Sequence, residues 1–244
     1  MINIILMKTI AIGVGENENI IQACHIFKEK HPKTNLKLIY RDEDLVRAVL
    51  DKQIDSVVRG SLPASNIMKE LKEKYPYLSR ATYVNGAEHE FLLTPVGIDE
   101  GETVEDKLNI VKNCINFLKK VGKTPKIAVL AEGREDDFGR GEEVSQSITE
   151  SKRLTKLIEE VTCEEVKNYF ILVEKAINDN CNIIVAPNGR VGNIIFRTLV
   201  LLNSWPSYGA ITFGMDKIYI DTSRDQSIEG YVRSLTLANS LDDI

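Results

Sequence analysis

A serine–arginine pair near the end of the chain could bind an anion, in the segment 219-YIDTSRDQSIEGYVRSL-235. The pattern predicts a strand that ends near Asp221 and a helix that follows a short loop. Ser223 and Arg224 fall in this loop, at the carboxyl end of the strand, where open α/β sheets bind their ligands. A hydroxyl and a guanidinium are suitable donors to a phosphate or carboxylate. In the alternative interpretation, Arg224 pairs with a neighbouring aspartate, Asp221 or Asp225, and binds nothing.

A loop with two glycines is the second candidate, in 182-NIIVAPNGRVGNIIFRTL-199. A predicted strand ends at Pro187, and Asn193 is predicted to cap the helix after the loop. Free backbone amides at the positive end of such a helix suit a phosphate or carboxylate. The candidate binding residues of this segment are Pro187, Arg190, Gly192, Asn193 and Arg197. The alternative is an ordinary strand-to-helix turn, whose glycines only fit the backbone.

Two more loops follow predicted strands. Arg59, Gly60 and Ser61 come directly after the strand predicted at 54–58, which makes Arg59 and Ser61 further candidate contacts for a ligand. The turn 13-GVGEN-17 lacks the third glycine of a dinucleotide fingerprint, although it can still be a ligand-facing loop.

The segments that flank these loops predict an α/β fold. Short, continuously apolar segments are typical of parallel strands that are covered on both faces, and they alternate here with helical patterns. Apolar residues recur every three or four positions in 104–120 and again in 164–178, which predicts two amphipathic helices. The predicted strands are 8–13, 36–40, 54–58, 81–84, 126–131, 182–186, 209–213 and 217–220.

The most polar stretch of the chain is 132–143, which follows the strand predicted at 126–131. It contains three glycines and a cluster of charges. Two interpretations stay open: a solvated loop, or a mobile loop that lines a cleft.

Composition excludes several classes of protein. The chain has 244 residues and a net charge of −5, and no basic block marks a nucleic-acid-binding surface. No apolar segment is long enough to cross a membrane. The four cysteines are scattered, which argues against a metal site and against a disulfide framework. We therefore expect a cytoplasmic protein with reduced thiols, no metal, no membrane and no nucleic-acid partner. The cysteines are Cys24, Cys114, Cys163 and Cys181.

The C-terminal half resembles phosphate acetyltransferases and phosphate butyryltransferases. That family has the motif P-x-x-x-x-G-N-I-x-[YF]-K, which reads 187-PNGRVGNIIFR-197 here, followed by 209-GAITFG-214 and 221-DTSRD-225. The whole chain looks like methanogenesis marker protein 4, the MtxX group. Members of that group carry the label "putative methyltransferase" and are related to phosphate acyltransferases.

The resemblance implies two three-layer α/β domains around a cleft, like those of isocitrate and isopropylmalate dehydrogenases. Residues 1–87 and 209–244 would form the first domain, and residues 88–208 the inserted second domain. It also implies a homodimer.

The function implied is that of a phosphate acyltransferase-like transferase with a phosphate- or CoA-type ligand in the interdomain cleft. CoA or an acyl phosphate would be the substrate, and no other cofactor is indicated. Arg224 would neutralise phosphate charge and Ser223 would donate a hydrogen bond, which makes them the catalytic candidates. The helix terminus at Asn193 and the side chain of Arg59 would hold the anion.

Two alternatives stay beside this one. The first is a methyltransferase, or a subunit that associates with methyltransferase subunits, although no methyl-donor glycine motif or corrinoid-binding D-x-H-x-x-G occurs. The second is a non-catalytic ligand-binding homologue. The chain departs from the acyltransferase pattern at two positions: Gly230 stands where the family has its catalytic aspartate, and Leu201 where it has an arginine.

Overall fold

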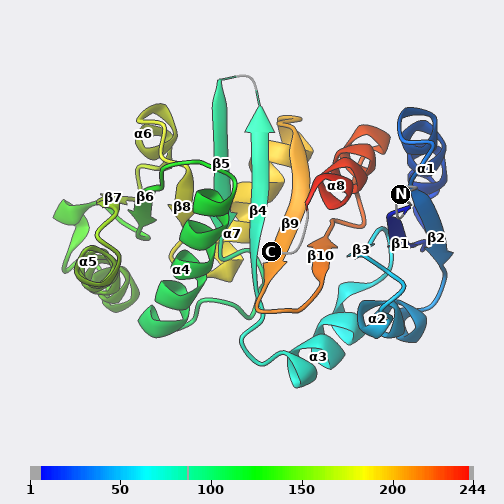
Figure 1. Cartoon of the computed structure of the whole chain (residues 1–244). Helices are drawn as coiled ribbons and strands as arrows, with labels where there is room; N and C mark the ends of the chain where they lie inside the picture. Colours follow the sequence, from blue (N-terminus) through cyan, green and yellow to red (C-terminus); the bar gives the residue numbers. More distant parts are fainter. Residues whose placement is uncertain (1–6, 87, 242–244) are drawn as a thin grey trace. The chain divides into compact units, whose positions relative to one another are not determined.

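The computed structural model describes residues 7–86 and 88–241, and it divides into two α/β units (Figure 1). Unit 2 is the continuous segment Ser79–Pro206, and unit 1 combines the segments before and after it. The family resemblance predicts domain boundaries at 87/88 and 208/209. Residue 87 lies outside the described residues, and the antiparallel strands 79–86 and 89–94 both belong to unit 2.

In unit 1 the described strands lie in the order β2-β1-β3-β10-β9. The strands β1, β2, β3 and β10 run parallel, and β9 is antiparallel to β10. The carboxyl ends of β1, β3 and β10 therefore meet at one edge of the sheet. The bounds are β1 Thr9–Gly13, β2 Asn35–Ile39, β3 Ser56–Val58, β9 Ser207–Phe213 and β10 Ile218–Asp221.

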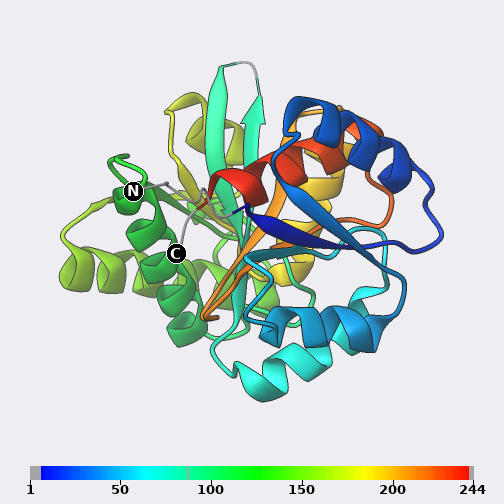
Figure 2. The same ribbon diagram turned by 45° about the vertical axis from the view of Figure 1, so that its right-hand side comes forward.

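Helices cover both faces of this sheet, α1 and α8 on one and α2 and α3 on the other (Figure 2). Because side chains alternate along a strand, Ala11, Val57 and Tyr219 join the core under α2 and α3. Their neighbours Ile10, Val58 and Ile220 are equally buried and point to the opposite face. The bounds are α1 Asn19–Lys30, α2 Asp42–Leu50, α3 Ala64–Lys74 and α8 Ile228–Ser240.

The described strands of unit 2 lie in the order β4-β5-β8-β6-β7. The strands β4 and β5 form the antiparallel hairpin, whereas β5, β8, β6 and β7 run parallel. The carboxyl ends of these four strands share one edge. The bounds are β4 Ser79–Gly86, β5 His89–Thr94, β6 Lys126–Leu130, β7 Glu165–Phe170 and β8 Ile183–Val185.

The helices of unit 2 lie on both sides of its sheet, with α4 in front of the strands and α7 behind them in Figure 1. The helix predicted at 104–120 is confirmed as α4, which Thr103 and Asp106 begin with a reciprocal capping box. The polar stretch 132–143 is a loop with one short 3-10 turn up to the start of α5. The bounds are α4 Val104–Lys120, α5 Glu142–Thr162, α6 Val173–Asn178 and α7 Gly189–Phe196, with a π-helical continuation, Arg197–Leu202.

The helix predicted at 164–178 is wrong in its first half. Residues Glu165–Phe170 form the strand β7, which pairs with β6, and only Val173–Asn178 are helical, as α6. Along β7, most residues are only partly covered, since the strand lies at the end of the strand order. Its sequence thus lacks the continuous apolar run of a central strand, and a helical spacing arose by coincidence.

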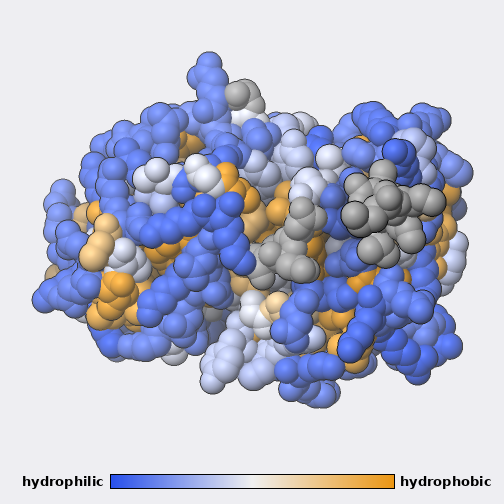
Figure 3. All heavy atoms as spheres, in the orientation of Figure 1, coloured by the Kyte–Doolittle hydropathy of each residue, from blue (hydrophilic) through white to orange (hydrophobic). Residues whose placement is uncertain are grey.

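No helix among the described residues is long and apolar enough to cross a membrane. Most of the face drawn in Figure 3 is hydrophilic, with apolar patches between the charged side chains.

The four thiols are free, and they differ in burial. Cys24, Cys114 and Cys181 are buried, whereas Cys163 is exposed. Burial raises the pKa of Cys24 to about 11 and raises that of Cys114 as well. Since the thiolate is the reactive form, we expect one fast thiol with a disulfide reagent at pH 8 in the native protein and four after denaturation. Cys163→Ser should remove the fast phase, and a fast phase that persisted in this variant would contradict the assignment.

Candidate functional site

Three loops meet at the carboxyl ends of β1, β3 and β10 in unit 1. The amide of Ser61 donates to the carbonyl of Gly13 at 3.2 Å, and the Ser61 hydroxyl accepts from the amide of Gly15 at 2.8 Å. Between these contacts Gly60 has a φ of +65°, and a Cβ there would lie 1.8 Å from the Gly13 oxygen. Only glycine fits this position, so the β3 loop is locked to the β1 loop.

Arg59 ties the β3 loop to the β10 loop. Its side chain is buried and donates to the carboxylate of Asp221 and to the carbonyls of Leu62 and Thr222. The family resemblance implies a phosphate contact for Arg59, which stays a prediction. In the structure its guanidinium donates to groups of the protein, so Arg59 supports the loops around it.

Arg224 lies in the same cluster, and its side chain is exposed. Within the described part of the chain it forms no ion pair with Asp221 or Asp225, and Asp221 is held by Arg59. The backbone of Arg224 is fixed, since its carbonyl accepts from Nδ2 of Asn17 at 2.7 Å and from the Tyr231 hydroxyl at 3.0 Å. An arginine with a fixed backbone and an uncompensated charge is suited to bind an anion.

The first turn of α8 follows this arginine. Ser227 caps the helix by accepting from the amide of Gly230 at 3.1 Å, and the hydroxyl of Ser223 accepts from the amide of Asp225 at 3.2 Å. Hydrogen bonds from its own backbone amide and from Ser227 lower the pKa of Glu229, so this exposed group is a carboxylate at neutral pH. The N-terminus of α8 is therefore capped by Ser227 and carries the negative charge of Glu229. The binding of an anion at this end would depend on Arg224 more than on the helix dipole.

Gln226 fills the space beside Gly230. Its side chain is 3 % exposed, and its Nε2 has no hydrogen-bond partner among the described residues. A Cβ at position 230 would lie 2.6 Å from Cδ of Gln226. The glutamine and the glycine therefore fit each other, and an aspartate at position 230 would collide with the carboxamide.

The second candidate segment lies in unit 2, and its helix begins earlier than predicted. Asn193 was expected to cap it, but the cap is Asn188, whose side chain accepts from the amide of Val191 at 3.0 Å. Asn193 lies inside α7 and donates from Nδ2 to the carbonyl of Val96 at 3.1 Å. The amide of Gly189 already donates to the carbonyl of Glu100 at 3.1 Å.

Gly189 and Gly192 accommodate the loop after β5. A Cβ at Gly189 would lie 1.6 Å from the carbonyl oxygen of Gly97, and one at Gly192 would lie 1.9 Å from that of Pro95. These glycines thus permit a close approach of two backbones, and this supports the alternative in which they serve the turn itself.

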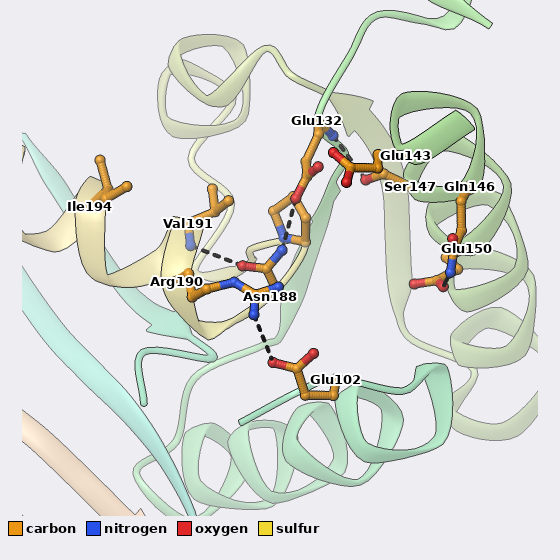
Figure 4. A pocket seen from close by; sticks show the side chains of 11 residues that line it. Glu102, Glu132, Glu143, Gln146, Ser147, Glu150, Asn188, Arg190, Val191 and Ile194 are labelled. Carbon is orange, nitrogen blue, oxygen red and sulfur yellow. Dashed lines mark hydrogen bonds and ion pairs between the residues drawn. The ribbon is translucent and has the colours of Figure 1, made fainter. Parts of the chain in front are cut away.

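A pocket of about 400 Å³ opens beside the start of α7 (Figure 4). Arg190 faces Glu102 across 3.8 Å, and Asn188 donates from Nδ2 to Oε1 of Glu132 at 2.8 Å. The lining residues are Glu102, Glu132, Glu143, Gln146, Ser147, Glu150, Pro187, Asn188, Arg190, Val191 and Ile194. Four of these are glutamates and one is an arginine, so the charge of the lining opposes a phosphate.

A buried lysine supports this pocket from α4. Lys107 donates to Oε2 of Glu150 at 3.2 Å and to the carbonyl of Pro187 at 2.8 Å. Desolvation would raise the pKa of Glu150, but hydrogen bonds from Gln146 and Lys107 outweigh it and lower this pKa. Glu150 therefore adds a negative charge to the pocket at neutral pH.

The predicted site residues thus divide between the units. Ser61, Ser223 and Arg224 lie together in unit 1 with the supporting Arg59. Pro187, Arg190, Gly192, Asn193 and Arg197 belong to unit 2, where Arg197 is exposed on the π-helical continuation of α7. Among the described residues, no group of three or more histidines, cysteines or carboxylates is arranged to hold a metal ion. The residues not predicted are Asn17, Tyr231, Gln226 and Lys107.

No family model matches the chain. It is 35 % identical over 237 residues to an "uncharacterized methyltransferase" of Methanocaldococcus jannaschii, covering 92 % of this chain and 94 % of that one. It is 33 % identical over 220 residues to the "putative methyltransferase mtx subunit X" of Methanosarcina barkeri, covering 86 % and 79 % of the two chains.

The solved structures that it resembles are of another kind. A branched-chain phosphotransacylase from Enterococcus faecalis superimposes with a TM-score of 0.72 and 21 % identity, over 96 % of this chain and 98 % of that one. A β-decarboxylating dehydrogenase from Thermococcus kodakarensis gives 0.59 and 12 %, over 96 % and 83 %. The expected fold, of the phosphate acyltransferase and isopropylmalate dehydrogenase type, is confirmed.

Proposed function

Because the chain belongs to the family of the mtx subunit X proteins, which has the fold of the phosphotransacylases, we propose that it is a transferase of the phosphate acyltransferase type. Its ligand carries a phosphate, either as an acyl phosphate or within CoA. The phosphate binds at the carboxyl edge of the unit 1 sheet, where Arg224 and Ser223 lie. Ser61 shapes the adjoining loop.

The observation that carries this proposal is the exposed guanidinium of Arg224, which forms no ion pair with the described residues. Asp221 is paired with Arg59, and the side chain of Arg224 is exposed to solvent. Asn17 and Tyr231 hold the Arg224 backbone. The acidic pocket of unit 2 offers no comparable place for an anion.

In the proposed reaction a thiol sulfur attacks the acyl carbon of an acyl phosphate. The new C–S bond replaces the C–O bond, inorganic phosphate leaves, and the proton of the thiol passes to the departing phosphate. Arg224 stabilises the charge that gathers on the leaving phosphate, and the Ser223 hydroxyl can turn to donate a hydrogen bond to it. With Gly230 where the acyltransferase family has its catalytic aspartate, the proposal assigns no protein base to the thiol proton.

Arg224→Ala is expected to weaken the binding of inorganic phosphate and CoA by about 1.5–3 kcal/mol, the range for hydrogen bonds to charged groups. Arg224→Lys should restore only part of the affinity, because an ammonium lacks the planar fork. Stability should change little, since the side chain is exposed. Calorimetric titration of both ligands, with melting curves alongside, measures these effects.

The matched control is Arg47→Ala, which removes another exposed arginine of unit 1, on α2. Its affinity for phosphate and CoA should equal that of the wild type. Unchanged affinity in Arg224→Ala would contradict the proposed role.

A second candidate function rests on the printed names of the relatives: a methyltransferase, or a subunit that works with one. A thermal-shift screen with CoA, an acyl-CoA, S-adenosylmethionine and phosphate separates the two. A response to S-adenosylmethionine alone favours the methyltransferase. Binding of CoA without turnover of acyl phosphate favours a non-catalytic homologue.

A further inference from the structure

The side chain of Asn17 joins the loop after β1 to the loop that carries Arg224. Its Nδ2 donates to the carbonyl of Arg224 at 2.7 Å and to that of Gln226 at 3.2 Å, across 207 and 209 residues of sequence. Its Oδ1 accepts from the amide of Asn19 at 3.1 Å, which fixes the orientation of the carboxamide. Both of its donor hydrogens therefore have a partner on the Arg224 loop.

Tyr231 holds the same loop from the side of α8. The residue is fully buried, and its hydroxyl lies 3.1 Å from the carbonyl of Ser223 and 3.0 Å from that of Arg224. Burial raises the pKa of Tyr231 to about 12, so its hydroxyl remains a donor throughout the neutral range. The Arg224 carbonyl thus lies between two donors that come from different elements.

The Arg224 side chain, in contrast, has no ion pair or hydrogen bond within the described part of the chain. The position of the guanidinium therefore depends on where the backbone of Arg224 is held. The hydrogen bonds from Asn17 and Tyr231 to the Arg224 carbonyl fix that backbone. An alanine at position 17 would leave the carbonyls of an exposed loop to water, which can replace the lost donors.

We propose that Asn17 is a positioning residue, which holds the Arg224 loop in the conformation that binds a phosphate group. This rests on the proposed function of Arg224 as the anion-binding residue. Asn17 itself need not touch the ligand, and the loop after β1 then serves the site through the backbone it supports.

The first measurement is hydrogen exchange in peptides that cover residues 222–227. Asn17→Ala should raise exchange there about 3–10-fold, as expected for the loss of one or two hydrogen bonds, with the remainder of unit 1 unchanged. Asn17→Asp keeps the acceptor for Asn19, loses both donors and places an oxygen against the two carbonyls, so it should raise exchange at least as much as alanine. Asn19→Ala is the control, because Asn19 reaches only the Gln226 carbonyl, at 3.3 Å, and not that of Arg224.

The second measurement is a double-mutant cycle in the titration of inorganic phosphate and CoA. Asn17→Ala should weaken binding about 3–10-fold in the wild type and have no further effect in Arg224→Ala. Tyr231→Phe removes the other donor to the Arg224 carbonyl and should show the same coupling with Arg224→Ala. It replaces Asn17→Ala in the cycle if that variant does not fold. An equal loss in both backgrounds, or no loss at all, would overturn the proposal.

The two measurements also separate this inference from the proposed function. If the wild type binds neither phosphate nor CoA, the proposed function fails, and with it the ligand part of this inference. Exchange in residues 222–227 then still decides whether Asn17 positions the loop, and unchanged exchange in Asn17→Ala would refute that part as well.

Discussion

Arg59→Leu is expected to lower the free energy of unfolding by about 3–5 kcal/mol, the usual result of removing one partner of a buried ion pair. Both side chains of the pair are almost fully buried, so Asp221 would lose the buried cation that balances its charge. The carbonyls of Leu62 and Thr222 would also lose their donors. The loops after β3 and β10 would then be joined by fewer hydrogen bonds, chiefly the one from the Thr222 hydroxyl to the Gly60 carbonyl at 2.7 Å, so the Arg224 loop should also become less ordered.

Urea unfolding of the wild type and the variant measures this effect. Arg59→Leu combined with Asp221→Asn should recover part of the lost stability, because the buried negative charge that Arg59 balanced is then gone. Arg47→Ala is the control: its ion pair with Asp44 is exposed, and stability should change little. A fully stable Arg59→Leu protein that had lost affinity for phosphate would show that Arg59 binds the ligand after all.

The sequence was informative where burial and local spacing coincide. Central strands such as β1 and β10 are covered on both faces, so their continuous apolar runs predict strands and the loops at their ends. The position of Arg224 beyond β10 follows from this directly. The exposed strand β7 has a mixed pattern, and its prediction failed for that reason.

What the sequence could not show are contacts between distant segments. Asn17 looks like any turn residue until the fold brings it to Arg224. The pairing of Asp221 with Arg59 was equally hidden, because the spacing along the chain favours the neighbouring Arg224. Spacing along the chain favours local pairs, whereas a parallel sheet brings together loops that follow different strands.

The role of the two glycines at the start of α7 could likewise not be decided from the local sequence. Two glycines before an apolar helix are compatible with a phosphate-binding loop and with a close backbone contact. The structure shows the contact, with the loop after β5 lying against Gly189 and Gly192, and it places glutamates around the nearby pocket. The local sequence of α7 contains neither that loop nor those glutamates.

Gly189→Ala and Gly192→Ala should each destabilise the protein by more than about 3 kcal/mol, beyond the usual cost of overpacking a core. The added Cβ would meet a backbone carbonyl oxygen at 1.6 Å in the first variant and at 1.9 Å in the second, and a backbone cannot turn away as a flexible side chain can. The loop after β5 would have to move away from α7, breaking the contact between the Gly189 amide and Glu100.

Thermal and urea unfolding of both variants measure this cost. Gly141→Ala is the control, because Gly141 is the N-cap of another helix of unit 2, α5, and a Cβ there would meet nothing within 4 Å. A ligand-binding role for these glycines gives the opposite expectation, in which stability is kept and affinity for phosphate or CoA is lost. Stable alanine variants would therefore contradict the packing role. Stability combined with a loss of affinity would support an anion site at the start of α7, despite the acidic pocket beside it.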